Sequence, residues 1–218
     1  MTPLTESEPR HAGHPAQRAL VVRSVVGEAI GPFLGDIAQL RATVLREWPT
    51  LQDSDAASQA RDLQVYLESW RSIAILVSDG DRLVGASIGL PLGDADEPLR
   101  RAFTAAGREV DRVFHFGGSM LLPAYRGRGL GHRFFDERES HARALGGFEL
   151  TTFRTVERAA DDPRRPPFGH SFKPFLLKRG YRRCGELAVA TAWHEVHSGG
   201  GQTPQKLATR SRPLERSF

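Results

Sequence analysis

The sequence predicts an α/β fold in which helices flank both faces of a mixed, mostly antiparallel sheet. Segments rich in β-branched residues alternate with segments of helical apolar spacing between residues 19 and 196. The segments 73–78 and 83–90 are joined by the short turn 79–82, which predicts an antiparallel hairpin. One helix separates the strands 112–122 and 148–156, and a strand–helix–strand unit predicts a parallel pair.

The remaining elements follow from local patterns. The first strand is expected at 19–26, and the helix at 33–48 has apolar residues at helical spacing and stops at Pro49. A second helix is expected at 60–70. The segment 93–111 interrupts the sheet and contains a short helix after Pro98. An Arg/Pro-rich segment at 157–172 precedes a helix at 173–180, and 181–196 closes the sheet as one or two strands.

Composition favours one domain at 19–197 within the 218 residues, between a disordered N-terminal tail, 1–18, and a disordered basic C-terminal tail, 198–218. The net charge of +4 lies mostly in that second tail, which argues against a nucleic-acid-binding face. A single cysteine, Cys184, excludes an internal disulfide and disfavours a metal site. Because no apolar run approaches about 20 residues and no signal peptide is visible, we expect a cytoplasmic protein without a membrane partner.

The segment Arg126–Gly131 carries the most specific signal, because Arg and Gly alternate between a strand and a charged helix. One interpretation is an ordinary turn, and another is an Arg-Gly segment that binds nucleic acid, although no aromatic residues interleave it. A third is an anion-binding loop, in which glycines let backbone N–H groups converge at a helix N-terminus. The triphosphate-binding loop is excluded, because His132 and Arg133 stand where Lys and Ser or Thr are required.

Residues 121–131, Leu-Leu-Pro-Ala-Tyr-Arg-Gly-Arg-Gly-Leu-Gly, resemble the acyl-CoA signature of the GNAT superfamily of N-acetyltransferases. Arg126, Gly129 and Gly131 fill its Arg/Gln-x-x-Gly-x-Gly/Ala positions, and Gly180-Tyr181 resembles a later family feature. The element order matches from about residue 19 to 196. The resemblance implies the acyl-CoA N-acyltransferase fold, in which the parallel strand pair splays.

The resemblance also implies acetyl-CoA as the cosubstrate. Backbone N–H groups between Arg126 and His132 would bind its pyrophosphate, and the strand end at Leu121 and Leu122 would bind the pantetheine arm. This cofactor-binding segment comprises Leu121, Leu122, Arg126, Gly127, Arg128, Gly129, Leu130, Gly131 and His132. Independently, Gly117 and Gly118 inside the strand indicate a bulge or close backbone approach, or else a packing kink.

His115 is the candidate general base. It lies eleven residues before Arg126, an offset at which some family members carry a catalytic Glu or His. An ordinary histidine pKa of about 6.5 suits proton transfer at neutral pH. The alternative is a core histidine with satisfied hydrogen bonds.

The general acid departs from the family pattern. The position of the usual Tyr is Leu176, and the position of an Asn that often begins the last helix is Gly169. Tyr181 is expected to pack in the core, whereas Ser171, His170 or water could supply the proton.

Two principal functions remain open. One is N-acetylation of a primary amine on a small molecule or peptide by a monomer or homodimer. The other is a non-catalytic acyl-CoA-binding module. RNA binding through the basic tail is a third and weaker alternative. The segments 93–111 and 157–172 are expected to border the acceptor site, and the second, whose charges balance, is expected to be a solvated loop.

Overall fold

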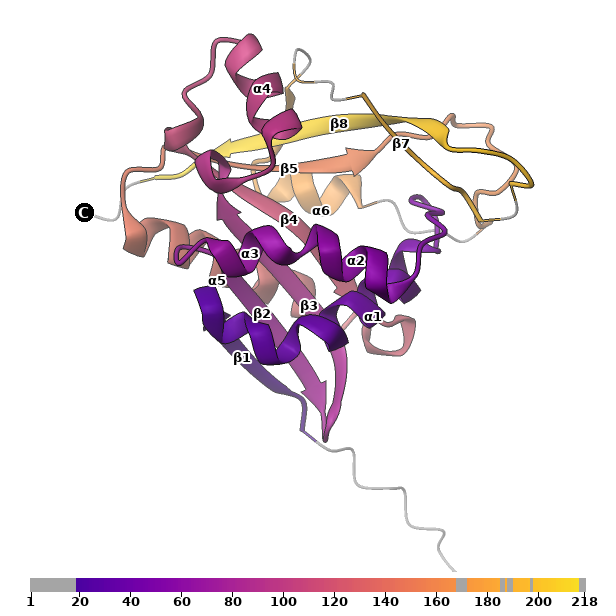
Figure 1. The fold of residues 1–218 in the computed structure, drawn as a ribbon, viewed down its shortest axis with the longest axis horizontal. Helices are drawn as coiled ribbons and strands as arrows, with labels where there is room; N and C mark the ends of the chain where they lie inside the picture. The colour runs from indigo at the N-terminus through magenta and orange to yellow at the C-terminus, as the bar shows by residue number, and fades with distance from the viewer. Residues whose placement is uncertain (1–18, 168–171, 185–186, 188–189, 197, 216–218) are drawn as a thin grey trace, which may run out of the picture.

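A computed structural model describes residues 19–167, 172–184, 187, 190–196 and 198–215, which fold around one central sheet (Figure 1). The strands are β1 (Val21–Val26), β2 (Ile73–Asp79), β3 (Arg82–Pro91), β4 (Val113–Leu121), β5 (Leu150–Val156), β6 (Arg182–Cys184), β7 (Ala190–Trp193) and β8 (Thr203–Pro213). The α-helices are α1 (Leu34–Leu45), α2 (Ala56–Asp62), α3 (Gln64–Glu68), α4 (Glu97–Ala105), α5 (Leu130–Leu145) and α6 (Lys173–Lys178). Short 3-10 helices are η1 (Gly27–Phe33), η2 (Leu92–Asp94), η3 (Val110–Arg112) and η4 (Pro123–Tyr125).

The sheet has the order β1-β2-β3-β4-β5-β8-β6, and β7 also pairs with β8. The β4–β5 pair is parallel, and the other strand pairs among the described residues are antiparallel. Helix α5 connects the parallel pair. These findings confirm the predicted fold class, including the hairpin of β2 and β3.

Helices cover the sheet on two faces (Figure 1). One apolar cluster joins α1, α3 and α4 to the sheet and includes Ile37, Leu99 and Phe103. A second joins α5 and α6 to the opposite face and includes Phe134 and Leu176. Below, the first is called the α1 face and the second the α5 face. Because side chains alternate along a strand, each strand residue is assigned to one of these faces.

Local sequence explains where the elements begin and end. The carboxylate of Asp55 accepts a hydrogen bond of 2.7 Å from the backbone N–H of Ser58 and caps α2. Gly80 turns the β2–β3 hairpin with φ +59°, and Gly146 ends α5 with φ +73°. The helix predicted at 60–70 is instead two, α2 and α3.

The prediction of a disordered C-terminal tail at 198–218 was wrong, because residues 203–213 form β8. Seven residues of β5 pair with β8, from Leu150 opposite Pro213 to Val156 opposite Leu207. Leu207 and Leu214 are 8% and 7% exposed, so the domain extends past the predicted boundary at residue 197. The predicted N-terminal tail, 1–18, lies outside the described residues.

The segment 157–172 was predicted to be a solvated loop, but its described part is tied to the protein by charge pairs. Glu195, 6% exposed, accepts hydrogen bonds of 2.5 Å from both Arg158 and Arg164 and one of 2.8 Å from Gln205. Burial alone would raise the pKa of Glu195, but these three hydrogen bonds lower it to about 2. Arg158 also donates to the backbone oxygens of Pro49 and Thr50.

Candidate active site

The turn between β4 and α5 has the backbone that its glycines predict. Gly127 and Gly129 have φ of +77° and +79°, in the left-handed region that favours glycine. Gly129 is the N-cap of α5, and a Cβ built on either residue would meet nothing within 4 Å. Gly131 is already inside the helix, and its Cβ would lie 3.9 Å from Phe175.

This turn leaves a run of backbone donors without partners. Arg126 donates its N–H to Pro123, and His132 donates its N–H to Gly129. Within the described residues, no hydrogen bond is found for the N–H groups of 127–131. Since these groups stand at the N-terminus of a 16-residue helix, they form a potential anion site.

The loop arginines are held by neighbouring groups. Arg126 donates from Nε to the Leu121 oxygen at 3.0 Å, and its terminal nitrogen lies 2.7 Å from a carboxylate oxygen of Glu47. Arg128 donates to the Ala124 oxygen at 3.0 Å and stacks over Tyr125. None of these four contacts involves a backbone N–H group of 127–131, so those donors stay available to an anion.

The parallel strands separate as the resemblance implies. Pairing between β4 and β5 ends at Phe116 opposite Phe153, although β4 continues to Leu121 and β5 to Val156. The β4 edge at 117–121 therefore has no backbone partner from β5. Leu121 lies on this free edge. Leu122 instead donates its backbone N–H to the oxygen of Val84 and so hydrogen-bonds toward β3.

The two glycines of β4 produce the predicted bulge. Ile88 pairs with Gly118 while Gly89 pairs with Phe116, so Gly117 is the extra residue. A Cβ on Gly117 would lie 1.6 Å from the hydroxyl oxygen of Tyr66, which explains why this position requires glycine. The predicted bulge and close approach are therefore confirmed together.

Arg138 of α5 supports the bulge from the α5 face. It is 1% exposed, and one terminal nitrogen donates to the backbone oxygens of Ile88 at 3.3 Å and Gly118 at 3.2 Å. The other donates to Ser119 Oγ at 3.0 Å. Burial lowers the pKa of Arg138 to about 9, so the guanidinium remains charged at neutral pH. Sequence analysis did not identify this residue, because its role depends on strands distant in the chain.

His115 is buried, 4% exposed, on the α1 face. Its Nδ1 lies 3.2 Å from Thr152 Oγ1. Burial, and then the charges of Arg154 and Arg138, lower the pKa of His115 to about 3. Because such an imidazole binds a proton weakly at neutral pH, the geometry favours the core-histidine alternative over the general base.

Three polar side chains that sequence analysis did not select belong to elements of the α1 face near the end of β4–β5 pairing. They are Arg41 of α1, Tyr66 of α3 and Arg154 of β5. Burial raises the pKa of Tyr66 to about 12, and the charges of Arg41 and Arg154 oppose that rise. Tyr66 lies within the helix expected at 60–70, and nothing in that pattern gave it a functional role. For Arg154, the available signal was the polar Thr152 two residues earlier, because both side chains face the same side of a strand.

The predicted acid positions give no proton donor within the described chain. Leu176 is apolar and 2% exposed. Tyr181 is fully buried, as predicted, with its hydroxyl 2.8 Å from Thr151 Oγ1 and 3.0 Å from Glu139 Oε1. Gly169, His170 and Ser171 lie outside the described residues.

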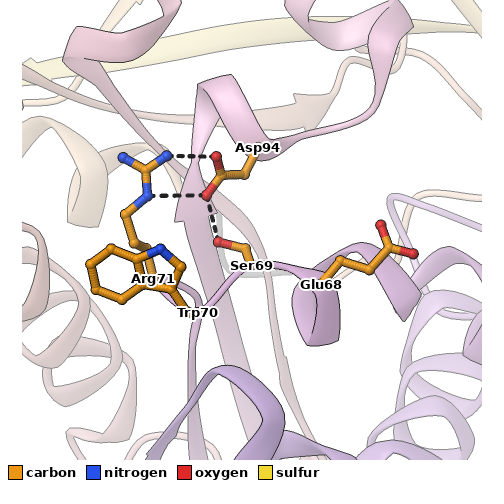
Figure 2. Close-up of a pocket in the computed structure, with 5 residues that line it drawn as sticks. All are labelled: Glu68, Ser69, Trp70, Arg71 and Asp94. Carbon is orange, nitrogen blue, oxygen red and sulfur yellow. Dashed lines mark hydrogen bonds and ion pairs between the residues drawn. The ribbon is translucent and has the colours of Figure 1, made fainter.

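A pocket of about 350 Å³ lies at the other end of the sheet, where β4 begins (Figure 2). Arg71 and Ser69 both contact the carboxylate of Asp94, each at 2.5 Å, and thereby connect the start of β2 to η2. Trp70 is 74% exposed beside them. These contacts are structural, and the pocket is remote from the glycine turn.

The chain matches the family model described as "Acetyltransferase (GNAT) family" over residues 38–162. No curated protein sequence matches the chain. Within the described residues, no helix is both long and apolar enough to cross a membrane, and no group of three or more His, Cys, Asp or Glu is placed to hold a metal ion.

Solved structures share the fold at low sequence identity. The putative acetyltransferase yncA from Salmonella typhimurium, solved with its cofactor acetyl-CoA, is 10% identical, with a TM-score of 0.56 over 92% of this chain and 96% of that one. A putative GNAT acetyltransferase from Desulfovibrio desulfuricans is 12% identical, with a TM-score of 0.54 over 90% and 100%. The Drosophila melanogaster polyamine N-acetyltransferase, which forms N-acetylagmatine, is 16% identical, with a TM-score of 0.50 over 89% and 100%.

Proposed function

Because the chain belongs to the GNAT acetyltransferase family, we propose that it transfers an acetyl group from acetyl-CoA to a primary amine by direct transfer. The observation that carries the proposal is the glycine turn before α5. Its N–H groups at 127–131 have no partner within the described chain, and no side chain fills the space beside Gly127 and Gly129.

Each part of the cosubstrate has a matching set of groups. The free N–H groups of 127–131 and the helix dipole would bind the pyrophosphate. The unpaired β4 edge at 117–121 would hydrogen-bond the amides of the pantetheine arm, as a sheet edge binds an extended chain. Bound there, acetyl-CoA would supply an activated thioester carbonyl to the acceptor amine.

Transfer forms an N–C bond as the C–S bond breaks, and the attacking nitrogen loses one proton. His115 is the general base that sequence analysis offered, but its burial and low pKa support a packing role instead. We therefore propose that water accepts this proton and that solvent protonates the leaving thiolate. A cytoplasmic location and a monomeric or homodimeric state remain predictions.

Binding of acetyl-CoA tests the loop assignment. At a concentration 100 times the dissociation constant, ligand linkage stabilises a protein by roughly 2.7 kcal/mol. Gly129→Val should abolish the resulting thermal shift, because a side chain would occupy the space beside the free N–H groups. Gly107→Val is the matched control, since Gly107 also has a positive φ, +70°, and open space around its Cβ, but lies after α4.

Both valine variants should lose similar stability from backbone strain, of about 1–2 kcal/mol. Only the Gly107→Val protein should retain the wild-type shift with acetyl-CoA. If the folded Gly129→Val protein shifts as the wild type does, the loop assignment is wrong.

A further inference from the structure

Arg154 is a half-buried cation without a carboxylate partner. It directly follows Phe153, the last β5 residue paired with β4, and strand alternation places it on the α1 face with Thr152 and His115. No described carboxylate lies within 4.0 Å of it. Four other half-buried arginines each contact one, Arg71, Arg158, Arg179 and Arg212, whereas Arg210 of β8 makes no ion pair with a described residue.

Arg41 brings a second cation to the same place. It lies one helical turn after Ile37, which is 1% exposed, so its side chain leaves α1 toward the sheet. Arg41 is half-buried and also makes no ion pair with a described residue. Burial is the main cause that lowers the pKa of Arg154; the charge of Asp96 and the Tyr66 hydroxyl oppose that shift, and the charge of Arg41 adds to it.

A half-buried guanidinium without an ion pair has lost part of its hydration, and a bound anion would offset that cost. Tyr66 offers a third donor. Its hydroxyl makes no hydrogen bond with a described residue and is protonated at neutral pH, since burial raises its pKa from an already high 10 to about 12. It contacts the bulge at Gly117, so the donors border the opening between β4 and β5.

We propose that Arg41, Arg154 and Tyr66 bind the carboxylate of the acceptor, so that the acceptor is a small amine that also carries a carboxylate, as amino acids do. A planar guanidinium matches a carboxylate in geometry as well as charge. The exposed carboxylate of Asp96, whose charge raises the pKa of Arg154, adds a negative group suited to the acceptor's ammonium. This inference rests on the proposed acetyl transfer.

Matched amines test the carboxylate requirement. The probes are methionine with methioninamide and β-alanine with β-alaninamide, which differ in the acid group. Thermal shifts are measured with CoA present, and turnover is measured as release of free CoA thiol from acetyl-CoA. The acids should raise the melting temperature of the wild type. Their KM should be about 10- to 100-fold below the KM of the amides, the range expected of a charge-assisted contact.

Variants assign the effect to the arginines. Arg154→Gln and Arg41→Gln should each abolish the shift with the acids and raise their KM about 10- to 100-fold, while the KM for acetyl-CoA stays unchanged. Arg154→Lys should recover part of the affinity, since it keeps the charge but loses the planar fork. Arg108→Gln, at an exposed arginine without a described ion pair, should behave as the wild type.

The outcomes separate this inference from the proposed function. Equal shifts and rates for acids and amides, or acid binding that survives both glutamine substitutions, would overturn the carboxylate site and leave acetyl transfer intact. Acid binding that requires Arg154, in a protein that never releases thiol, would support the site and contradict acetyl transfer. Absence of acid binding together with absence of turnover would reject both.

Discussion

Replacing Leu207 tests whether the C-terminal residues form part of the core. Leu207 of β8 is 8% exposed, whereas its neighbour Lys206 is exposed. Truncating a buried leucine to alanine removes its transfer free energy and leaves a cavity, which together cost about 2–5 kcal/mol. Leu207→Ala should therefore lower the free energy of unfolding by that amount, and Lys206→Ala should change it by less than about 0.5 kcal/mol.

Urea denaturation followed by circular dichroism gives both free energies, and thermal melting gives a second measure. For a domain of this size, the loss corresponds to a melting temperature lower by roughly 4 to 20 °C. Equal stability of the two variants and the wild type would refute the reasoning, because it is the result expected of a disordered tail. Deletion of residues 203–218 should prevent folding, since β5 would lose its partner on that side.

Three further predictions concern buried polar groups. His115→Gln should lower the free energy of unfolding by about 1–3 kcal/mol and leave turnover per folded molecule unchanged. A kcat loss of about 10²–10⁴-fold in the folded variant would instead show that His115 is the general base. The Glu195 carboxylate, with its pKa lowered from 4.5 to about 2, should stabilise the protein fully above pH 4.5 and progressively less as pH falls toward 2. Melting curves across this range should decline less for Glu195→Gln than for the wild type, and parallel curves would contradict the network. Arg138→Met should lower the free energy of unfolding by about 1–3 kcal/mol, because it leaves buried oxygens at the β4 bulge unpaired. Calorimetry should also detect weaker acetyl-CoA binding. Unchanged affinity would mean that the bulge does not need Arg138.

The sequence was sufficient for features determined by neighbouring residues. The glycines of the turn predicted a donor-rich backbone before α5, and Gly127 and Gly129 have the positive φ that only glycine adopts at little cost. Gly117 and Gly118 predicted the bulge because interior glycines weaken a strand. In both cases, the property belongs to the local backbone.

Features that depend on distant partners were missed. The segment 203–213 has arginines and two prolines and so resembles a solvated tail, but Arg212 pairs with buried Glu139 of α5 at 3.0 Å. Similarly, Arg158 and Arg164 form ion pairs with Glu195, which is distant from them in the sequence. Local composition cannot distinguish a solvated charge from one that meets its partner in three dimensions.

The same limit applies to the candidate site. His115 stands at a suggestive offset from the turn, but only the packed structure reveals its burial and low pKa. Arg41, Tyr66 and Arg154 come from two helices and a strand, and none belongs to a contiguous motif. Their proximity follows from the pairing of β4 with β5 and from the packing of α1 and α3 on one face.

The most direct test of acetyl transfer is product formation from purified protein, acetyl-CoA and a panel of amines. Release of free CoA is followed with a thiol reagent, and the acetylated amine is identified by mass spectrometry. We predict one equivalent of thiol for each amide formed, with loss of both in the Gly129→Val protein. Acetyl-CoA binding without amine-dependent thiol release for any amine in the panel would contradict the account and indicate a non-catalytic acyl-CoA-binding module.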